Sequence, residues 1–253
     1  MNLEYRFDGP EDAPVLVLSN SLGTTLELWE SQLGALTRRF RVLRYDLRGH
    51  GASPVPPGPY TVDDLGGDVV ELLDRLGLER VSFCGLSIGG VTGMWLGANA
   101  PERFDRLVLA CTAPRIGTVE TWTERAANVR AHGTESLADA VMERWFTPAF
   151  AAEQPETVAR FRAMIAATPD EGYAGCCDAL RDFDFRTELG RVAPPTLVIS
   201  GELDPATPPE DGALLAGGIP DARLTVIPGV SHLANVARPD EFNDAVLSHL
   251  EAA

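Results

Sequence analysis

The chain has 253 residues, of which 45% are hydrophobic and 23% are charged, as in a globular protein with a substantial buried core. Its formal net charge is −16, and all 21 of its basic residues are arginine. This acidity argues against binding to nucleic acid and against docking on an anionic membrane. No apolar run approaches the roughly 20 residues that a transmembrane helix needs. We therefore expect that the protein neither spans a membrane nor docks on one.

The first residues lack the basic and apolar segments of a secretory signal, which predicts a cytoplasmic protein. The four cysteines are Cys84, Cys111, Cys176 and Cys177, and none forms a C-x-x-C pair. Adjacent cysteines also make poor zinc ligands. We therefore expect reduced, buried or partly buried thiols and no metal site. The sequence specifies no oligomeric state.

Short apolar runs alternate with amphipathic stretches along most of the chain. The predicted strands are Leu3–Phe7, Val15–Ser19, Arg41–Tyr45, Arg80–Cys84, Arg106–Cys111, Thr196–Ser200 and Arg223–Ile227. The predicted helices between and after them are Trp29–Leu36, Thr61–Leu76, Ile88–Asn99, Pro208–Ala216 and Asp240–Glu251. This alternation is typical of an α/β fold, with a mostly parallel sheet flanked by helices.

The alternation breaks in the middle of the chain, where no strand is predicted. Aromatic residues gather there on four predicted helices, which are Thr121–His132, Ser136–Trp145, Pro155–Ala166 and Tyr173–Phe183. We interpret residues 117–189 as a helical cap inserted into a core formed by residues 1–116 and 190–253. Such an insertion would hang over the carboxyl ends of the strands, where ligands bind in open α/β sheets.

The segment Phe83–Gly90 reads F-C-G-L-S-I-G-G and contains a G-x-S-x-G pattern centred on Ser87. A predicted strand precedes the pattern and a predicted helix follows it, which is the setting of a nucleophile elbow. Gly85 and Gly89 would let the neighbouring backbone pass close to the serine. The N-terminus of the helix would offer N–H groups to a developing negative charge. Ser87 is therefore the candidate nucleophile.

A serine needs a general base and an orienting acid to act as a nucleophile at neutral pH. His232 lies in a loop after the last predicted strand, from which it can reach the serine's edge of the sheet. Asp204 follows the preceding strand in the segment G-E-L-D-P, and Glu202 is the competing acid. The chain order Ser87, Asp204, His232 is that of the α/β-hydrolases and differs from the orders in other serine hydrolase folds.

The oxyanion hole of such a site needs two N–H donors. The residue after the nucleophile, Ile88, is one candidate. The other is Leu22, in the loop after the second predicted strand. The neighbouring Ser21 hydroxyl either contacts the substrate or caps this loop, and both interpretations stay open.

The segment D-L-R-G-H-G-A-S after the third strand contains charged residues that resemble catalytic ones. We expect Asp46 and Arg48 to contact each other and to support the site from below. His50 in this segment is expected to be structural. Of the other histidines, His132 lies in the predicted cap and His249 on a helix face that we expect to be exposed.

Together these segments resemble the α/β-hydrolase superfamily over the whole chain. Within it, the chain resembles the 3-oxoadipate enol-lactonases of the β-ketoadipate pathway, which serves the catabolism of aromatic compounds. The most specific segment is S-N-S-L-G-T-T-L-E-L-W from Ser19, because many relatives carry H-G in place of N-S. The segments G-L-S-I-G-G-V-T-G-M-W-L from Gly85 and W-F-T-P from Trp145 add to the resemblance.

The resemblance implies hydrolysis of the ring ester of an enol-lactone to 3-oxoadipate, through an acyl-enzyme on Ser87 and without a cofactor. The anionic lactone carries a carboxylate, so a cationic partner is expected. The candidates in the cap are Arg130, which we select for substrate binding, and Arg144, Arg160 and Arg162. Trp122 and Trp145 either line the pocket or pack the cap onto the core.

The same triad would also serve a C–C bond hydrolase of ring-cleavage products, a carboxylesterase or a cofactor-free perhydrolase. Ser87 argues against dehalogenases and epoxide hydrolases of this fold, which use an aspartate nucleophile. A binding module that kept the fold without turnover is the alternative from a different class. All three triad positions are filled, which argues against a binding module.

Overall fold

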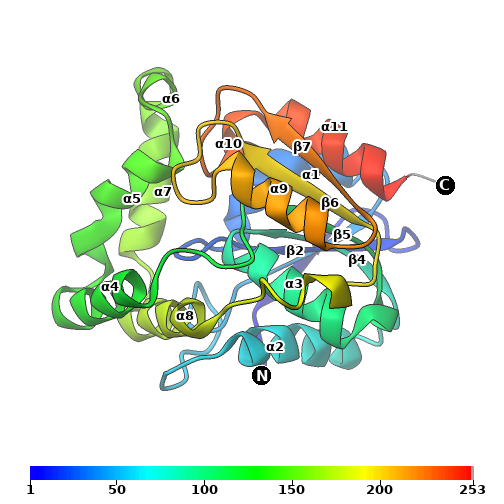
Figure 1. Cartoon of the computed structure of the whole chain (residues 1–253), viewed down its shortest axis with the longest axis horizontal. Coiled ribbons are helices and arrows are strands. Elements are labelled where there is room, and N and C mark those ends of the chain that lie inside the picture. The colour runs from blue at the N-terminus through cyan, green and yellow to red at the C-terminus, as the bar shows by residue number, and fades with distance from the viewer. Residues whose placement is uncertain (252–253) are drawn as a thin grey trace.

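A computed structural model describes residues 1–251, whose strands form one seven-stranded sheet in the order β1-β3-β2-β4-β5-β6-β7 (Figure 1). The strands are β1 Tyr5–Asp8, β2 Val15–Ser19, β3 Arg41–Tyr45, β4 Val81–Leu86, β5 Phe104–Ala110, β6 Thr196–Gly201 and β7 Ala222–Ile227. β1 pairs with β3 in the antiparallel sense, and every other neighbouring pair is parallel. The mostly parallel sheet is confirmed, and each strand begins and ends within two residues of its predicted bounds.

The central strands are buried on both faces. All six residues of β4 and of β6 are buried, and so are the last four residues of β2 and of β5. A strand covered on both faces is an almost continuous apolar run, which is why the sequence shows these strands so clearly. The four cysteines are buried and free, as expected.

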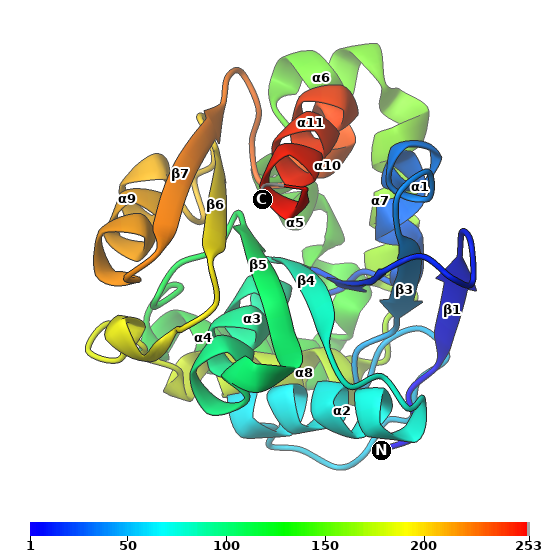
Figure 2. The same ribbon diagram turned by 90° about the vertical axis from the view of Figure 1, so that its right-hand side faces the viewer.

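Helices cover both faces of this sheet. Figure 2 shows α1 (Glu30–Leu36) and α11 (Pro239–Leu250) on one face, with α2 (Val62–Arg75), α3 (Ile88–Asn99) and α9 (Pro209–Gly218) on the other. The first turn of α2 is closed by a capping box, in which Thr61 and Asp64 satisfy each other's backbone N–H groups. The short helix α10 (Ala234–Ala237) lies between the last strand and α11 and was not predicted.

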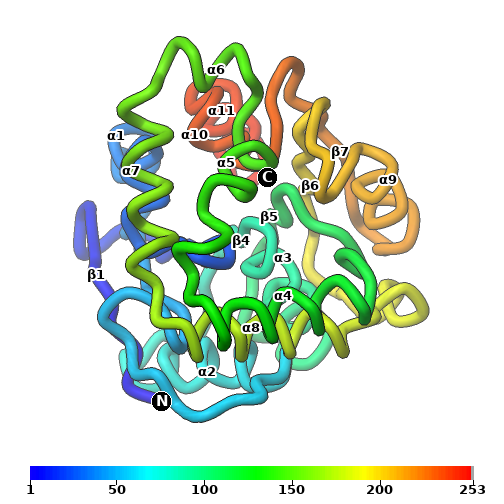
Figure 3. Tube along the Cα trace, turned by 90° about the vertical axis from the view of Figure 1, so that its left-hand side faces the viewer, coloured from blue at the N-terminus to red at the C-terminus, as the bar shows by residue number. Residues whose placement is uncertain are grey.

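Five helices lie between β5 and β6. They are α4 (Val119–His132), α5 (Ala138–Trp145), α6 (Pro148–Glu153), α7 (Pro155–Ala166) and α8 (Asp170–Asp182). They gather on one side of the molecule, and Figure 3 shows them in front of the strands. Four of them were predicted, whereas α6 was not. The division at residues 117 and 189 stays a proposal, and residues 252–253 of the predicted core lie outside the described residues.

Backbone contacts attach this helical segment to the loops of the core. Gly49 has a φ of +74°, and a Cβ atom on it would lie 2.3 Å from the Cα of Gly172 at the start of α8. The Gly58 N–H donates to Glu171 on the same helix over 3.1 Å. The end of α5 is tied to the loop after β7, since the Leu233 N–H donates to the Trp145 carbonyl over 3.2 Å. These contacts hold the segment above the strand ends in this structure.

Two of the predicted side-chain environments are wrong. Arg48 contacts the carboxylates of Asp64 and Asp68 on α2 and not that of Asp46. The Asp46 carboxylate instead accepts hydrogen bonds from the backbone N–H groups of Leu26 and Ala52. His249 lies on the inner face of α11 and is only 4% exposed. In both cases the partner comes from an element that is distant in the sequence.

Candidate active site

Ser87 lies on the strained turn between β4 and α3. Its φ of 60° and ψ of −115° are unfavourable for a residue with a side chain, at a cost of about 1–3 kcal/mol. A Cβ atom on Gly85 would lie 2.1 Å from the Gly89 carbonyl oxygen, and one on Gly89 would lie 2.4 Å from that of Ser19. Both glycines are therefore required by close backbone approaches, and the turn pushes the serine out at the strand end.

Asp204 and His232 lie close together, although 28 positions separate them in the sequence. The Nδ1 atom of His232 lies 2.7 Å from Oδ2 of Asp204. An ionised carboxylate only accepts hydrogen bonds, so Nδ1 carries the proton and Nε2 is left as the basic nitrogen. This tautomer is the one that a general base for a serine needs.

The loop after β6 holds the Asp204 carboxylate from several sides. The N–H groups of Ala206 and Thr207 donate to Oδ1, and the Thr207 hydroxyl donates to Oδ2 over 2.7 Å. Burial opposes ionisation of Asp204, but the His232 ring and these hydrogen bonds outweigh burial and lower its pKa. The carboxylate is thus kept charged beside the imidazole.

The competing acid, Glu202, has a different partner. Its Oε2 accepts the Gly229 N–H over 2.8 Å, and its side chain does not contact His232. This bond ties the end of β6 to the loop that carries the histidine. Of the two acids weighed from the sequence, the structure brings Asp204 to the imidazole.

Ser87 and His232 line one cavity of about 300 Å³ between the strand ends and the helical segment. Its wall is mostly apolar and carries several polar groups. The core contributes Ser21, Leu22, Ser87, Ile116, Pro205, Ala206 and His232, the loop before α4 contributes Gly117, and the helices contribute Thr121, Trp122, Arg125, Val141, Arg144, Trp145, Tyr173 and Leu180. A small apolar cavity with a few convergent polar groups is the usual form of a small-molecule site.

Of the two candidate oxyanion donors, Leu22 lines this cavity together with Ser87, whereas Ile88 is buried and begins α3 directly after Ser87. Within residues 1–251, no hydrogen-bond acceptor contacts the N–H of either residue. Both N–H groups are therefore available for a developing oxyanion.

The loop that carries Leu22 is held by buried hydrogen bonds on both sides. Before it, the Asn20 side chain donates to the Tyr45 carbonyl over 2.8 Å. After it, the Gly23 N–H donates to Nε2 of His50 over 3.0 Å. Burial lowers the pKa of His50 to about 4, so the ring stays neutral and can accept this bond.

Three of the four candidate substrate-binding residues line the cavity, and the fourth does not. Ser21, Trp122 and Trp145 are lining residues, and the two tryptophans are also packed at 8% and 5% exposure. The selection of Arg130 for substrate binding is corrected, because Arg130 does not line the cavity and contacts the carboxylates of Glu171 and Asp178 instead.

Two other arginines, Arg125 and Arg144, line the cavity in which Arg130 was expected. Arg144 was one of the cap candidates, whereas Arg125 was missed. The signal that could have found Arg125 is its spacing, since it follows Trp122 by three positions. Residues i and i+3 of a helix lie on the same face, so a pocket-lining Trp122 also brings Arg125 to the pocket.

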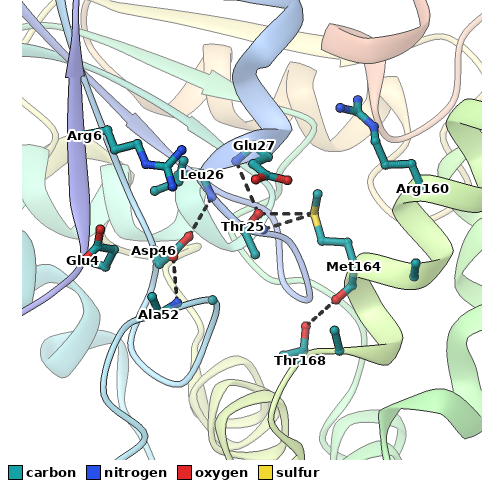
Figure 4. A pocket seen from close by; sticks show the side chains of 13 residues that line it. Glu4, Arg6, Thr25, Leu26, Glu27, Asp46, Ala52, Arg160, Met164 and Thr168 are labelled. Atoms are coloured by element: carbon teal, nitrogen blue, oxygen red, sulfur yellow. Dashed lines mark hydrogen bonds between the residues drawn. The ribbon is translucent and has the colours of Figure 1, made fainter.

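A second cavity, of about 500 Å³, opens between α7 and the first loops of the core. Figure 4 shows Arg160 and Met164 on one side of it and Thr25 and Asp46 on the other. Asp46 is buried, and both of its oxygens already accept backbone N–H groups, from Leu26 and Ala52. This cavity is larger than the first but holds none of the candidate catalytic groups.

Within residues 1–251, none of the helices is both long and apolar enough to cross a membrane. Histidine, cysteine, aspartate and glutamate side chains do not gather there in a group of three or more that could hold a metal ion.

The family model of the alpha/beta hydrolase fold matches residues 14–239, so the chain belongs to the α/β-hydrolase family.

The chain is 44% identical to 3-oxoadipate enol-lactonase 2 of Acinetobacter baylyi over 96% of its own length and 91% of that protein's. Among solved structures, the enol-lactonase from Burkholderia xenovorans is 46% identical with a TM-score of 0.97, covering 99% of this chain and 96% of that one. A malate-bound thermophilic esterase from Thermogutta terrifontis is 29% identical with a TM-score of 0.92, covering 98% and 92%. The chain therefore belongs, within the α/β-hydrolases, to the family of the 3-oxoadipate enol-lactonases, and the resemblance noted in the sequence is confirmed.

Proposed function

We propose that this chain hydrolyses the ring ester of 3-oxoadipate enol-lactone to 3-oxoadipate, with Ser87 as nucleophile, His232 as general base and Asp204 as orienting acid. The observation that carries the proposal is that Ser87 and the Asp204-bound His232 line one cavity. The similarity to named enol-lactonases over almost the whole chain supports the choice of substrate.

The first half of the reaction forms an acyl-enzyme. His232 Nε2 takes the proton of the Ser87 hydroxyl as its oxygen attacks the lactone carbonyl. The negative charge that develops on the carbonyl oxygen is stabilised by the N–H groups of Leu22 and Ile88. The ring C–O bond then breaks, and the proton on His232 passes to the departing enol oxygen, which tautomerises to the ketone.

The second half releases the product. A water molecule loses a proton to His232 and attacks the acyl carbon, and the ester bond to Ser87 breaks. The proton returns to the serine oxygen, and the new carboxylic acid releases its proton to solvent, so that the product leaves with two carboxylates. Asp204 stays ionised throughout and stabilises the imidazolium, in keeping with its lowered pKa. The whole reaction consumes only the lactone and one water molecule.

We further propose that residues 117–189 act as the cap of this site, and that Ser21, Trp122 and Trp145 contact the substrate. The helices of this segment carry half of the cavity wall. The core proposed here comprises residues 1–116 and 190–253, and the cytoplasm is the proposed location, because the substrate is an intermediate of catabolism.

The function is tested by the loss of ultraviolet absorbance when the purified protein is added to 3-oxoadipate enol-lactone. We expect kcat/KM for the lactone to exceed that for nitrophenyl acetate by orders of magnitude. A fluorophosphonate probe should label Ser87 in the folded protein, as peptide mass spectrometry would detect. If the lactone is hydrolysed no better than nitrophenyl acetate while Ser87 is labelled, the protein is a general carboxylesterase. Failure to label Ser87 contradicts serine catalysis altogether.

A further inference from the structure

Two arginines of the helical segment face the catalytic cavity without a carboxylate partner. Arg125 lies on α4 and Arg144 in the last turn of α5, and both are partly buried. No residue that lines the cavity is acidic. Among the ion pairs of residues 1–251, none involves either arginine, although the chain has 37 acidic residues that could supply one.

The other cap arginines that were candidates for substrate binding, Arg130, Arg160 and Arg162, each form an ion pair with a carboxylate. Arg130 lies 2.7 Å from Asp178, and Arg162 lies 2.6 Å from Asp139. Arg160 is paired with Glu30 of the core. Every other arginine of residues 117–189 is paired with a carboxylate in this way. The two arginines on the cavity wall depart from that state together, which points to an anion that comes from outside the protein.

The electrostatics of the pair favour such an anion. Burial and the neighbouring charge of Arg125 both lower the pKa of Arg144. A guanidinium stays protonated in proteins, so the two positive charges persist and repel each other. A bound carboxylate would replace this repulsion by attraction, in a cavity whose apolar walls strengthen the interaction. Perturbed charges of this kind in a cleft are typical of functional sites.

Both arginines are held in place by groups that leave donors free. The Arg125 guanidinium lies 4.8 Å from the centre of the Trp122 ring and interacts electrostatically with the Tyr173 hydroxyl. These contacts orient its plane but use few of its five N–H donors. Arg144 is held through its backbone, because its carbonyl oxygen accepts a hydrogen bond from the Ser231 hydroxyl over 2.5 Å. Arg144 is thereby tied to the residue next to His232.

We propose that Arg125 and Arg144 form a carboxylate-binding end of the catalytic cavity, which selects acidic esters and lactones over neutral ones of the same size. Planar guanidinium groups suit a carboxylate because each can donate two parallel hydrogen bonds. This inference rests on the proposed function for the position of the ester at Ser87. The carboxymethyl arm of the enol-lactone would then lie against α4 and α5.

The selectivity is measured with two lactones that share the same enol-lactone ring. One is 3-oxoadipate enol-lactone, and the other is α-angelica lactone, in which a neutral methyl group replaces the carboxymethyl arm. The variants are Arg125→Gln, Arg144→Gln and the double variant, with Arg130→Gln as the matched control on the same helix. We expect the ratio of kcat/KM for the acidic over the neutral lactone to fall about 10-fold in each single variant and about 100-fold or more in the double variant.

The control should leave this ratio within about twofold of the parent value, because Arg130 lies outside the cavity. Arg144→Lys should restore part of the ratio relative to Arg144→Gln, since the charge is kept while the planar donor pair is lost. An unchanged ratio in the double variant overturns the inference. Circular dichroism and thermal unfolding identify any variant that has failed to fold.

A second readout separates this inference from the proposed function. Adipate is used as an inhibitor while nitrophenyl acetate reports on the triad. Competitive inhibition by adipate that the double variant weakens about 100-fold supports the carboxylate site even if the enol-lactone is not turned over. Turnover of the enol-lactone with equal inhibition of parent and double variant contradicts the carboxylate site and leaves the proposed function standing.

Discussion

The core loops and the helical segment build the two halves of one cavity by different means. In the core, each candidate catalytic group is held by its own stretch of chain. Ser87 takes its conformation from the glycines two positions away on either side, and the Asp204 carboxylate is bonded by residues two and three positions further on. In the helical segment, Arg125 and Arg144 reach the cavity only because α4 and α5 pack above the strand ends.

This difference separates the chemistry from the choice of substrate. The core half contains the proposed nucleophile, base and oxyanion donors, which would act on any ester carbonyl. The helical half contains aromatic walls and two cations, which we propose to recognise what the ester carries. Substitutions in the core should therefore lower turnover of every ester, whereas those in the helical segment should change the preference among esters.

The largest effect is expected for Ser87→Ala. Because triad members act as a unit, kcat should fall by about 10⁵ for the enol-lactone and the neutral lactone alike. The measurement is single-turnover kinetics with both lactones at saturating enzyme. A residual activity above about one hundredth of the parent value would mean that another group attacks the carbonyl.

The next effect distinguishes the two acids after β6. Asp204→Asn should lower kcat about 10³-fold to 10⁴-fold, because the amide stabilises the wrong imidazole tautomer. Glu202→Gln should stay within about threefold, since Glu202 bonds only to the Gly229 N–H. Steady-state assays of both variants on one ester make the comparison. If Glu202→Gln lowered kcat more than Asp204→Asn, Glu202 and not Asp204 would be the acid that orients His232.

A smaller effect is expected for His50, which supports the oxyanion loop without touching the substrate. His50→Leu removes the acceptor of the Gly23 N–H, so kcat should fall about 10-fold to 100-fold with little change in KM. His50→Gln keeps an acceptor at the end of the side chain and should restore part of kcat.

The specific readout for His50 is inhibition by a trifluoromethyl ketone, whose tetrahedral adduct needs the oxyanion donors. His50→Leu should weaken this inhibitor about as much as it lowers kcat, while inhibition by adipate stays the same. Equal weakening of both inhibitors would indicate a general loss of structure and no particular effect on the loop.

The smallest effect concerns His249, a buried histidine of the core that lies away from the cavity. Burial and the charge of Arg223 lower its pKa to about 4, so the folded state keeps it neutral. Since the unfolded state takes up a proton below about pH 6.5, stability from this group is complete above that pH and is lost as the pH falls towards 4.

His249→Gln should therefore reduce the loss of stability between pH 7 and pH 5 by about 1–2 kcal/mol, as urea unfolding at both pH values would measure. Its kcat at pH 7 should equal that of the parent, because no residue of the cavity contacts it. An unchanged pH dependence would show that His249 is accessible to protons in the folded state.

Much of the core was predictable because its signals are local. Val15–Ser19 and Arg41–Tyr45 are strands with the predicted bounds, since strands covered by helices leave apolar runs that end at turns. The short helices α6 and α10 were missed, because four to six residues are too few to show a helical period.

The failures share one physical cause, which is that their partners are distant in the sequence. Arg48 is paired with carboxylates of α2, and His249 is buried by the packing of α11 on the sheet. Arg130 is likewise neutralised by α8, some forty positions further on. Residue type and spacing carry no record of such packing.

The sequence by itself determined the fold class and the identity of the candidate nucleophile, base and acid. Each of these lies in the turn or loop that follows a strand, and parallel strands bring their carboxyl ends to one edge of the sheet. Only the tertiary structure decided which arginines face the serine. The helices of the middle segment have no sheet register to fix them, so their packing alone determines which faces line the cavity.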